Sequence, residues 1–229
     1  MPARTELVPA LADSQLALES LVLDVNEALE VHEAAADSLL LVEEGSGILA
    51  LAGAEHDLQE GTAALVAAGE QATLSAGHAG IVLVRATAGD GADRHAPLGP
   101  RTGVERLDRE RDASATGARS FQILLGPNNG SARATMFVGY VPPGKAPWHY
   151  HLYDEIVLIR EGSGRLHVDG RVEDIGPGSS FRLRPRQVHI VENASATEEL
   201  TLVGVFTPAG SPTAAYLPAE VAADYRFLG

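Results

Sequence analysis

Two segments of this chain match each other without a gap. Residues 37–70 align with residues 154–187 at a constant offset of 117 positions (154 minus 37). The identical tetrapeptide EGSG anchors the alignment, at Glu44–Gly47 in one copy and at Glu161–Gly164 in the other. An internal repeat of this length indicates that one structural unit has been used twice.

The apolar runs of the chain are short and rich in Val, Leu and Ile, and Gly, Asp and Pro separate them, with 24 Gly and 13 Pro in all. Such runs predict many short antiparallel strands that form sandwiches or barrels. Residues 89–118 are polar and contain Pro97 and Pro100, which is typical of a linker with one helical turn near residues 104–111. The predicted domains are therefore residues 1–88 and 119–229, joined by this linker.

Composition limits the possible partners and sites. The chain has no cysteine, so neither a disulfide nor a thiolate metal site is available. The net charge of −14 argues against nucleic acid as a partner. No apolar run approaches the roughly 20 residues that span a bilayer, and no secretory signal is evident at the N-terminus. We therefore expect a cytoplasmic protein without membrane contact, with homodimer formation left open.

A candidate metal site lies between the two glycines Gly144 and Gly162. In an extended strand a His-x-His pair projects both imidazoles to one face, and His149 and His151 form such a pair. Glu155 keeps the same parity if that strand continues, and His189 follows as a further candidate. Three imidazoles and a carboxylate suit one divalent first-row metal, namely Mn, Fe, Ni, Co or Zn, and leave coordination positions open for water or substrate.

The N-terminal copy lacks these ligands at the offset of 117. His32 aligns with His149, and the other three positions carry residues that cannot serve together as ligands: Ala34, Ser38 and Ala72. An isolated imidazole binds no metal tightly. We therefore expect a barrel without a metal in the N-terminal copy, with His32 as a structural histidine.

The segment HYHLYDEIVLIREG resembles the first cupin motif, HxHxxxE followed after six residues by a glycine, here Gly162. A looser second motif corresponds to Gly178, Pro185, His189 and Asn193, with Gln187 in place of its usual second glycine. The resemblance implies an all-β bicupin, with two tandem cupin barrels (double-stranded β-helices of jelly-roll type). It also implies a metal in the C-terminal barrel alone, bound by three histidines and a glutamate.

Strand periodicity also assigns the residues near His189. Phe181 and Leu183 are expected to point into the barrel, and Arg182 and Arg184 outward as a surface or interface feature rather than a substrate clamp.

Aromatic residues near the first motif have two interpretations. Trp148 and Tyr150 could line the barrel mouth and stack on a substrate, or pack within the protein. The C-terminal segment could pack on a barrel or on a neighbour through Tyr216, Tyr225 and Phe227.

The leading functional hypothesis is an enzyme that acts on a small molecule at the metal. The motif resembles those of quercetinase-like enzymes, which favours a dioxygenase or related oxidoreductase in which Glu155 shifts between ligand and proton acceptor. The alternatives are a metal-dependent isomerase, decarboxylase or hydrolase, or a non-enzymatic small-molecule sensor. A sugar-phosphate isomerase is disfavoured because the chain contains a single lysine, Lys145.

Overall fold

The computed structural model describes residues 2–89, 98–115 and 118–217, and these residues form strands and turns without an α-helix. Two 3-10 turns are present, η1 (Arg109–Arg111) and η2 (Pro127–Asn129). All strand pairs are antiparallel. The predicted all-β architecture of antiparallel strands is confirmed.

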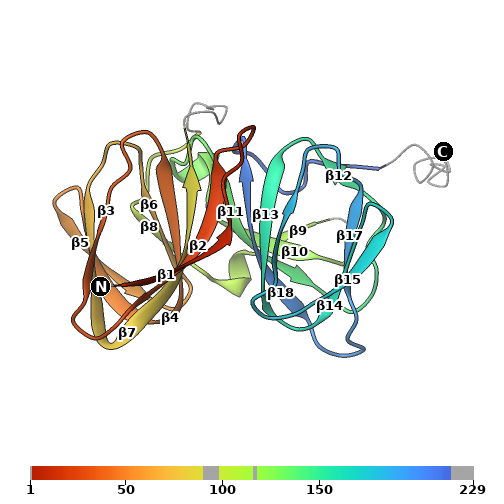
Figure 1. Cartoon of the computed structure of the whole chain (residues 1–229), viewed down its shortest axis with the longest axis horizontal. Coiled ribbons are helices and arrows are strands. Elements are labelled where there is room, and N and C mark those ends of the chain that lie inside the picture. The colour runs from red at the N-terminus through yellow and green to blue at the C-terminus, as the bar shows by residue number, and fades with distance from the viewer. Residues whose placement is uncertain (1, 90–97, 116–117, 218–229) are drawn as a thin grey trace.

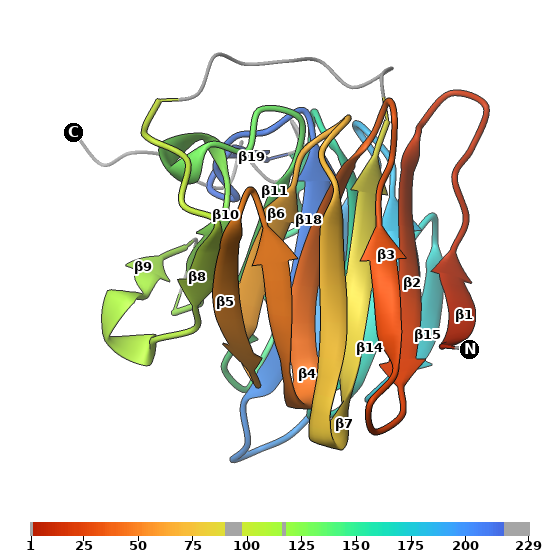
Figure 2. The ribbon, with the colours of Figure 1, turned by 90° about the vertical axis from the view of Figure 1, so that its left-hand side faces the viewer.

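The N-terminal half forms one eight-stranded sheet with the order β1-β2-β7-β4-β6-β8, in which β3 also pairs with β7 and β5 with β4 (Figure 2). The strands are β1 (Ala3–Val8), β2 (Leu16–Leu23), β3 (Ala28–Val31), β4 (Asp37–Leu51), β5 (Ala54–Gln59), β6 (Thr62–Val66), β7 (Ala72–Ala88) and β8 (Val104–Arg106).

The C-terminal half forms three sheets, with the orders β16-β13-β18-β11-β10-β9, β15-β14-β17 and β12-β19. The strands are β9 (Ala113–Ser114), β10 (Ser120–Leu125), β11 (Thr135–Val141), β12 (Tyr150–His151), β13 (Asp154–Glu161), β14 (Gly164–Val168), β15 (Arg171–Ile175), β16 (Ser180–Leu183), β17 (His189–Asn193), β18 (Leu200–Thr207) and β19 (Ala215–Tyr216). Figure 1 shows the two halves side by side, with β2 and β11 between them.

The described part of the predicted linker is folded against both halves. Its first strand, β8, pairs with β6 of the N-terminal sheet, and β9 pairs with β10 of the C-terminal half. The helical turn predicted near residues 104–111 is limited to η1, because residues 104–106 are used as a strand. Residues 90–97 and 116–117 of the linker lie outside the described residues.

Hydrophobic side chains form three clusters, one within each half and one between them. In β13, Val157 and Ile159 belong to the cluster inside the C-terminal half, whereas Ile156 and Leu158 belong to the cluster that both halves share. Alternate side chains of a strand point to opposite faces, so β13 is buried on both sides. In the N-terminal half β4 is also buried on both sides: its alternate residues belong to the cluster inside that half and to the cluster that both halves share.

The backbone repeats at the shared EGSG sequence. Gly45 and Gly162 are equivalent in the alignment and have φ angles of 79° and 82°. A Cβ atom would lie 2.3 Å from the carbonyl oxygen of Gly80 at the first position and 2.8 Å from that of Glu199 at the second. Both copies therefore need glycine there, for the positive φ and for the close approach of a neighbouring strand.

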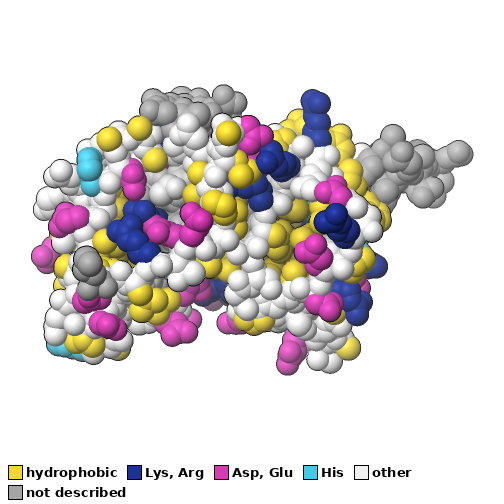
Figure 3. Space-filling model, viewed as in Figure 1, with side chains coloured by type: hydrophobic (Ala, Val, Ile, Leu, Met, Phe, Trp, Pro, Cys, Tyr) yellow, Lys and Arg dark blue, Asp and Glu magenta, His cyan; other side chains and the backbone are white. Residues whose placement is uncertain are grey.

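Figure 3 shows one face of the molecule, on which basic side chains lie among acidic ones rather than in a continuous basic surface. None of the helical segments in the described part has the length and hydropathy required to span a bilayer.

Candidate metal centre

The segment HYHLYDE does not form one continuous strand, so the predicted strand through His149, His151 and Glu155 is wrong. β12 ends at His151, the chain bends at Leu152 and Tyr153, and β13 begins one residue before Glu155. The chain changes sheets at this bend, because β12 pairs with β19 whereas β13 pairs with β16 and β18. The carboxylate therefore approaches the imidazoles through a turn rather than through strand parity.

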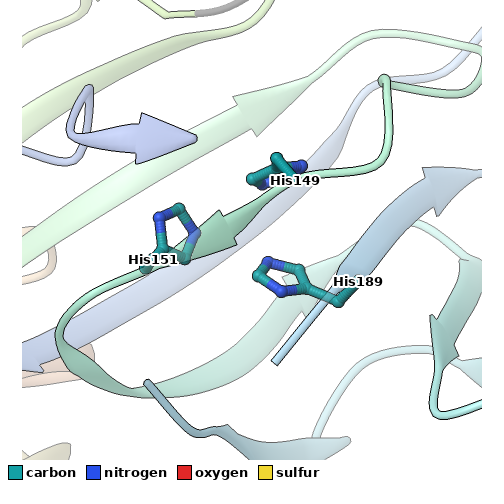
Figure 4. Close-up of side chains that lie close together, drawn as sticks. All are labelled: His149, His151 and His189. Atoms are coloured by element: carbon teal, nitrogen blue, oxygen red, sulfur yellow. The ribbon is translucent and has the colours of Figure 1, made fainter. Parts of the chain in front are cut away.

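Three of the four predicted ligands converge inside the C-terminal half. One ligand atom from each of His149, His151 and His189 lies within 4.8 Å of the others, and Figure 4 shows the three rings facing a common space. His149 and His189 lie far apart in the sequence, and an isolated β-bridge between their backbones brings their side chains together. All three residues are at most 7% exposed. Buried His149, His151 and His189 could hold a metal.

Hydrogen bonds to backbone carbonyls orient two of the imidazoles. Nδ1 of His149 lies 2.9 Å from the carbonyl oxygen of Pro147, and Nδ1 of His189 lies 2.9 Å from that of Gln187. A carbonyl oxygen can only accept, so Nδ1 carries the proton in both rings and Nε2 keeps its lone pair. Metal-bound histidines are commonly oriented in this way, and the donor set therefore fits a metal ion.

Burial also keeps the three imidazoles neutral. It lowers the pKa of His149 to about 4 and that of His151 to about 3, and the neighbouring imidazole of His189 adds to both shifts. The pKa of His189 is lowered as well, mainly by burial. Neutral imidazoles are the form that binds a metal, so the site needs no deprotonation near neutral pH.

Glu155 lies beside this triad but outside the mutually close set. Its Oε2 atom is 3.5 Å from Nε2 of His151, and the residue is 4% exposed. Burial raises the pKa of Glu155 to about 8, and the guanidinium of Arg119 acts in the opposite direction. The carboxyl group is thus able to exchange a proton near neutral pH.

The imidazoles line a cavity of about 90 Å³ whose walls are mainly apolar and aromatic, including Phe121, Phe137 and Leu202. Two further lining residues, Arg119 and Tyr153, were not identified from the sequence. The Tyr153 ring stacks between His151 and Phe206, with centroid distances of 4.5 and 4.0 Å. Tyr153 lies within the first motif, between His151 and Glu155, and this position was a usable signal.

Arg119 brings a positive charge to the cavity. Burial lowers the pKa of its guanidinium, and the charge of Glu155 opposes that shift. No local pattern marks Arg119, because it lies just after the predicted linker and meets the triad only in the folded chain.

The residues near His189 agree with the predicted strand faces. Leu183 lines the cavity, and Phe181 packs against the inner cluster. Arg182 pairs with Asp154 and donates to the carbonyl oxygens of Pro9 and Leu16, at 2.8 and 2.6 Å. Arg182 is therefore an interface residue between the two halves.

The remaining predicted side chains have intramolecular neighbours. Arg184 pairs with Asp13 of the N-terminal half at 2.7 Å. Trp148 meets His167 edge to face at 6.0 Å, and Tyr150 stacks on Tyr216 with centroids 5.6 Å apart. The predicted anchors Tyr225 and Phe227 lie outside the described residues.

The alignment of His32 with His149 is wrong by one residue. In the N-terminal half Val31 pairs with Ala72, just as His149 pairs with His189 in the C-terminal half. His32 is exposed, and its Nδ1 lies 2.8 Å from the carbonyl oxygen of Glu70. It is a hydrogen-bonded structural histidine, as expected, and the position equivalent to His149 holds an apolar side chain.

The turn before His189 supports this one-residue shift of the alignment. It also shows which residue stands in place of the second glycine of the second motif. The amide of Gly69 donates to the carbonyl of Glu33 at 2.8 Å, and the amide of Arg186 donates to that of His151 at 2.6 Å. Gly69 and Arg186 have φ angles of 80° and 66°. The glycine of the second motif is therefore replaced by Arg186, not by Gln187, and the turn keeps its left-handed residue.

Comparison with known proteins agrees with this geometry. Residues 136–206 match the profile of the family described as Cupin domain. No protein of curated function matches the chain.

Solved structures resemble the chain over most of its length. Oxalate decarboxylase from Bacillus subtilis at pH 4.6 has a TM-score of 0.72 and 15% identity, covering 90% of this chain and 71% of that one. AerE from Microcystis aeruginosa has a TM-score of 0.71 and 13% identity, covering 90% and 96%. A cupin 2 conserved barrel domain protein from Leptotrichia buccalis has a TM-score of 0.63 and 15% identity, covering 90% and 89%. At these identities the likeness shows a cupin fold.

Proposed function

We propose that this protein is a metal-dependent enzyme that acts on a small molecule bearing a carboxylate. The proposed ligands are His149, His151, His189 and Glu155, and the proposed catalytic group is Glu155. The observation that carries this proposal is the convergence of three buried, neutral imidazoles on a cavity that also contains a carboxyl group and a guanidinium.

The charged side chains of the cavity suggest how a substrate would be held. A bound divalent metal would supply a Lewis acid that polarises a carbonyl or carboxylate oxygen. The guanidinium of Arg119 would attract the anionic group and fix its plane by paired hydrogen bonds. The apolar walls would keep water away and strengthen both interactions. A cavity of about 90 Å³ suits a small acid.

Glu155 is suited to move a proton in this setting. Its pKa of about 8 lies near neutral pH, where a group can both accept and release a proton. Its Oε2 atom lies 3.5 Å from Nε2 of His151, so Glu155 could either coordinate the metal or transfer a proton.

The reaction type differs from the sequence expectation. No comparison supports the dioxygenase that the first motif favoured, and several similar solved structures are oxalate decarboxylases. A buried cation beside a metal site suits decarboxylation of a small acid better than oxidation of a large aromatic substrate. Decarboxylation is therefore the preferred reaction within the proposal.

We also propose that the chain contains two cupin barrels, residues 1–88 and 119–229, of which only the second binds metal. The repeated backbone conformation and the two separate inner clusters support this layout. The apolar Val31 and Ala72 at positions equivalent to two ligands support a first barrel without metal.

Metal analysis tests the site. The parent protein is expected to bind one equivalent of divalent metal by elemental analysis after dialysis. His149→Ala, His151→Ala and His189→Ala should each lose most of it, whereas His32→Ala, at the exposed histidine of the other half, should retain it. Equal metal content in the parent and the three triad variants would exclude the centre.

Product analysis tests the reaction. The metal-loaded protein is incubated with oxalate and other small mono- and dicarboxylates while carbon dioxide release and oxygen uptake are followed. Release of carbon dioxide without matching oxygen consumption supports the decarboxylase. Matching oxygen consumption would instead indicate an oxidase or oxygenase, and saturable binding without turnover would indicate a sensor.

A further inference from the structure

The segment that follows β18 forms part of the cavity wall. Residues 208–216, here called the strap, run from the end of β18 to β19, and Pro212 and Ala215 line the cavity. The other lining residues named above belong to the barrel strands or to the segment that enters β10. The strap is therefore a wall that lies outside the main sheets.

The base of the strap is firmly attached. Thr135 is fully buried in β11, and its hydroxyl donates to the carbonyl oxygen of Gly210 at 3.0 Å and accepts from the Gly210 amide at 2.9 Å. Ala209 beside it is 4% exposed. This end would move only if buried contacts were broken.

The tip of the strap, Ala215–Tyr216, has fewer and more exposed contacts than its base. β19 pairs with β12 through two residue pairs, Tyr150 with Tyr216 and His151 with Ala215. The rings of Tyr150 and Tyr216 stack at 5.6 Å with an interplanar angle of 20°, and Tyr216 is 45% exposed. Between base and tip, a hydrogen bond of 3.5 Å joins the Tyr153 hydroxyl to the carbonyl oxygen of Pro212.

These attachments differ in the cost of opening. Separating two residue pairs, one partly exposed ring stack and one hydrogen bond breaks few buried contacts, and local opening of this kind occurs readily in folded proteins. Opening the cavity through the barrel wall would instead break the inner cluster, with Val157, Phe206 and other fully packed side chains. Of these two walls, the strap is the less costly to open.

We infer that the strap is the gate of the metal cavity and that the Tyr150–Tyr216 stack is its latch. The strap pairs with β12, the strand that contains His151, so closing it also orders the backbone of one ligand. As a gate to a metal site, this inference rests on the proposed function. Release of the latch should then speed ligand and metal exchange.

Metal release tests the latch. The zinc-loaded full-length protein is mixed with excess EDTA, and the rate of zinc loss is measured. Tyr216→Ala should release zinc about three- to tenfold faster, the range expected from loss of one aromatic pair. Tyr216→Phe keeps the stacked ring and should match the parent. A parental rate in Tyr216→Ala, or equal acceleration in both variants, would overturn the inference.

Hydrogen exchange separates this inference from the proposed function, because it needs no metal. In the metal-free protein, amides of the strap and of β12 should exchange faster in Tyr216→Ala than in the parent or Tyr216→Phe, while β18 remains protected. Unchanged exchange in Tyr216→Ala would overturn the gate. A parent that binds no zinc would contradict the proposed function, and hydrogen exchange alone would then decide the gate.

Discussion

Glu43 and Arg160 form an ion pair, with Oε2 and Nε 2.7 Å apart, and they are equivalent residues of the internal repeat (160 minus 43 is 117). Two equivalent residues can contact each other only where an approximate two-fold axis relates the two copies. The hydrophobic cluster shared by both halves follows the same relation, since Leu39 and Leu41 join it together with their equivalents Ile156 and Leu158. The two halves therefore pack as two subunits of a symmetric dimer would.

Glu43 is expected to make stability depend on pH. Burial raises its pKa despite the attraction of Arg160, and its second oxygen, Oε1, is buried without a hydrogen-bond partner among the described residues. Between the ordinary and the raised pKa the folded state binds more protons than the unfolded state, so the free energy of unfolding falls as pH rises. Glu43→Gln removes this titration.

Thermal unfolding of the parent and Glu43→Gln at pH 4 and pH 7 measures the effect. The stability of the variant relative to the parent should increase from the lower to the higher pH. A relative stability that decreases over this range would mean that the ion pair outweighs burial. Glu44→Gln, at the exposed neighbouring residue, serves as the control and should show a smaller change with pH.

The sequence was sufficient for features that depend on periodicity and on repeated spacing. The alternation of apolar residues in β13 predicted an inner face with Val157 and Ile159, and the two motifs predicted that His149, His151 and His189 would meet. Strand continuity through Glu155 failed, because a bend that moves the chain between sheets leaves the spacing of the motif unchanged.

Two other features depended on tertiary structure. The N-terminal copy has one residue more between the ligand position and the next strand (Val31 to Asp37 against His149 to Asp154), and a gapless alignment could not detect this. Arg119 reaches the triad through folding of a polar segment with no repeat or motif. Its position beside the triad therefore could not be predicted from sequence patterns.

Arg186 and Gly69 offer a reciprocal test of backbone strain. Both have positive φ angles, 66° and 80°, at equivalent turns, but only one is glycine. A non-glycine residue in this region costs about 1–2 kcal/mol, partly offset by the larger chain entropy of glycine. Arg186→Gly is expected to stabilise the protein by up to about 1 kcal/mol in chemical denaturation. Gly69→Ala, where a Cβ meets no atom within 4 Å, should destabilise it by about 1 kcal/mol. Destabilisation by Arg186→Gly would show that contacts of the Arg186 side chain outweigh the strain.

Asn193 is expected to stabilise the end of the β17 strand. It is 2% exposed, and its amide donates to the carbonyl oxygens of Val141 and Glu198 at 2.8 and 2.7 Å. Asn193→Ala leaves the buried carbonyl oxygen of Val141 without this donor and should cost about 1–3 kcal/mol of unfolding free energy. Asn128→Ala, at an exposed position, should change it by less than about 0.5 kcal/mol. Equal stability of the two variants would contradict this assignment.

Arg119 is expected to determine whether the cavity binds an anion. Its guanidinium lies in a mainly apolar cavity with the three imidazoles, and its charge influences Glu155 and Tyr153 there. A charge-assisted pair with a carboxylate contributes about 1.5–3 kcal/mol, which corresponds to a loss of about 10- to 100-fold in affinity when it is removed. Calorimetric titration of the metal-loaded protein with oxalate should therefore show this loss in Arg119→Gln.

Two matched variants make the outcome specific to the guanidinium. Arg119→Lys keeps a positive charge but loses the planar fork, so its affinity should lie between those of the parent and Arg119→Gln. Arg184→Gln removes an exposed arginine that pairs with Asp13 and is not among the cavity-lining residues, and it should bind oxalate as the parent does. Metal content must be equal in all variants for the comparison to hold. Parental oxalate affinity in Arg119→Gln would contradict the assignment of Arg119 as the anion-binding side chain, since no other cationic side chain is among the described residues that line this cavity.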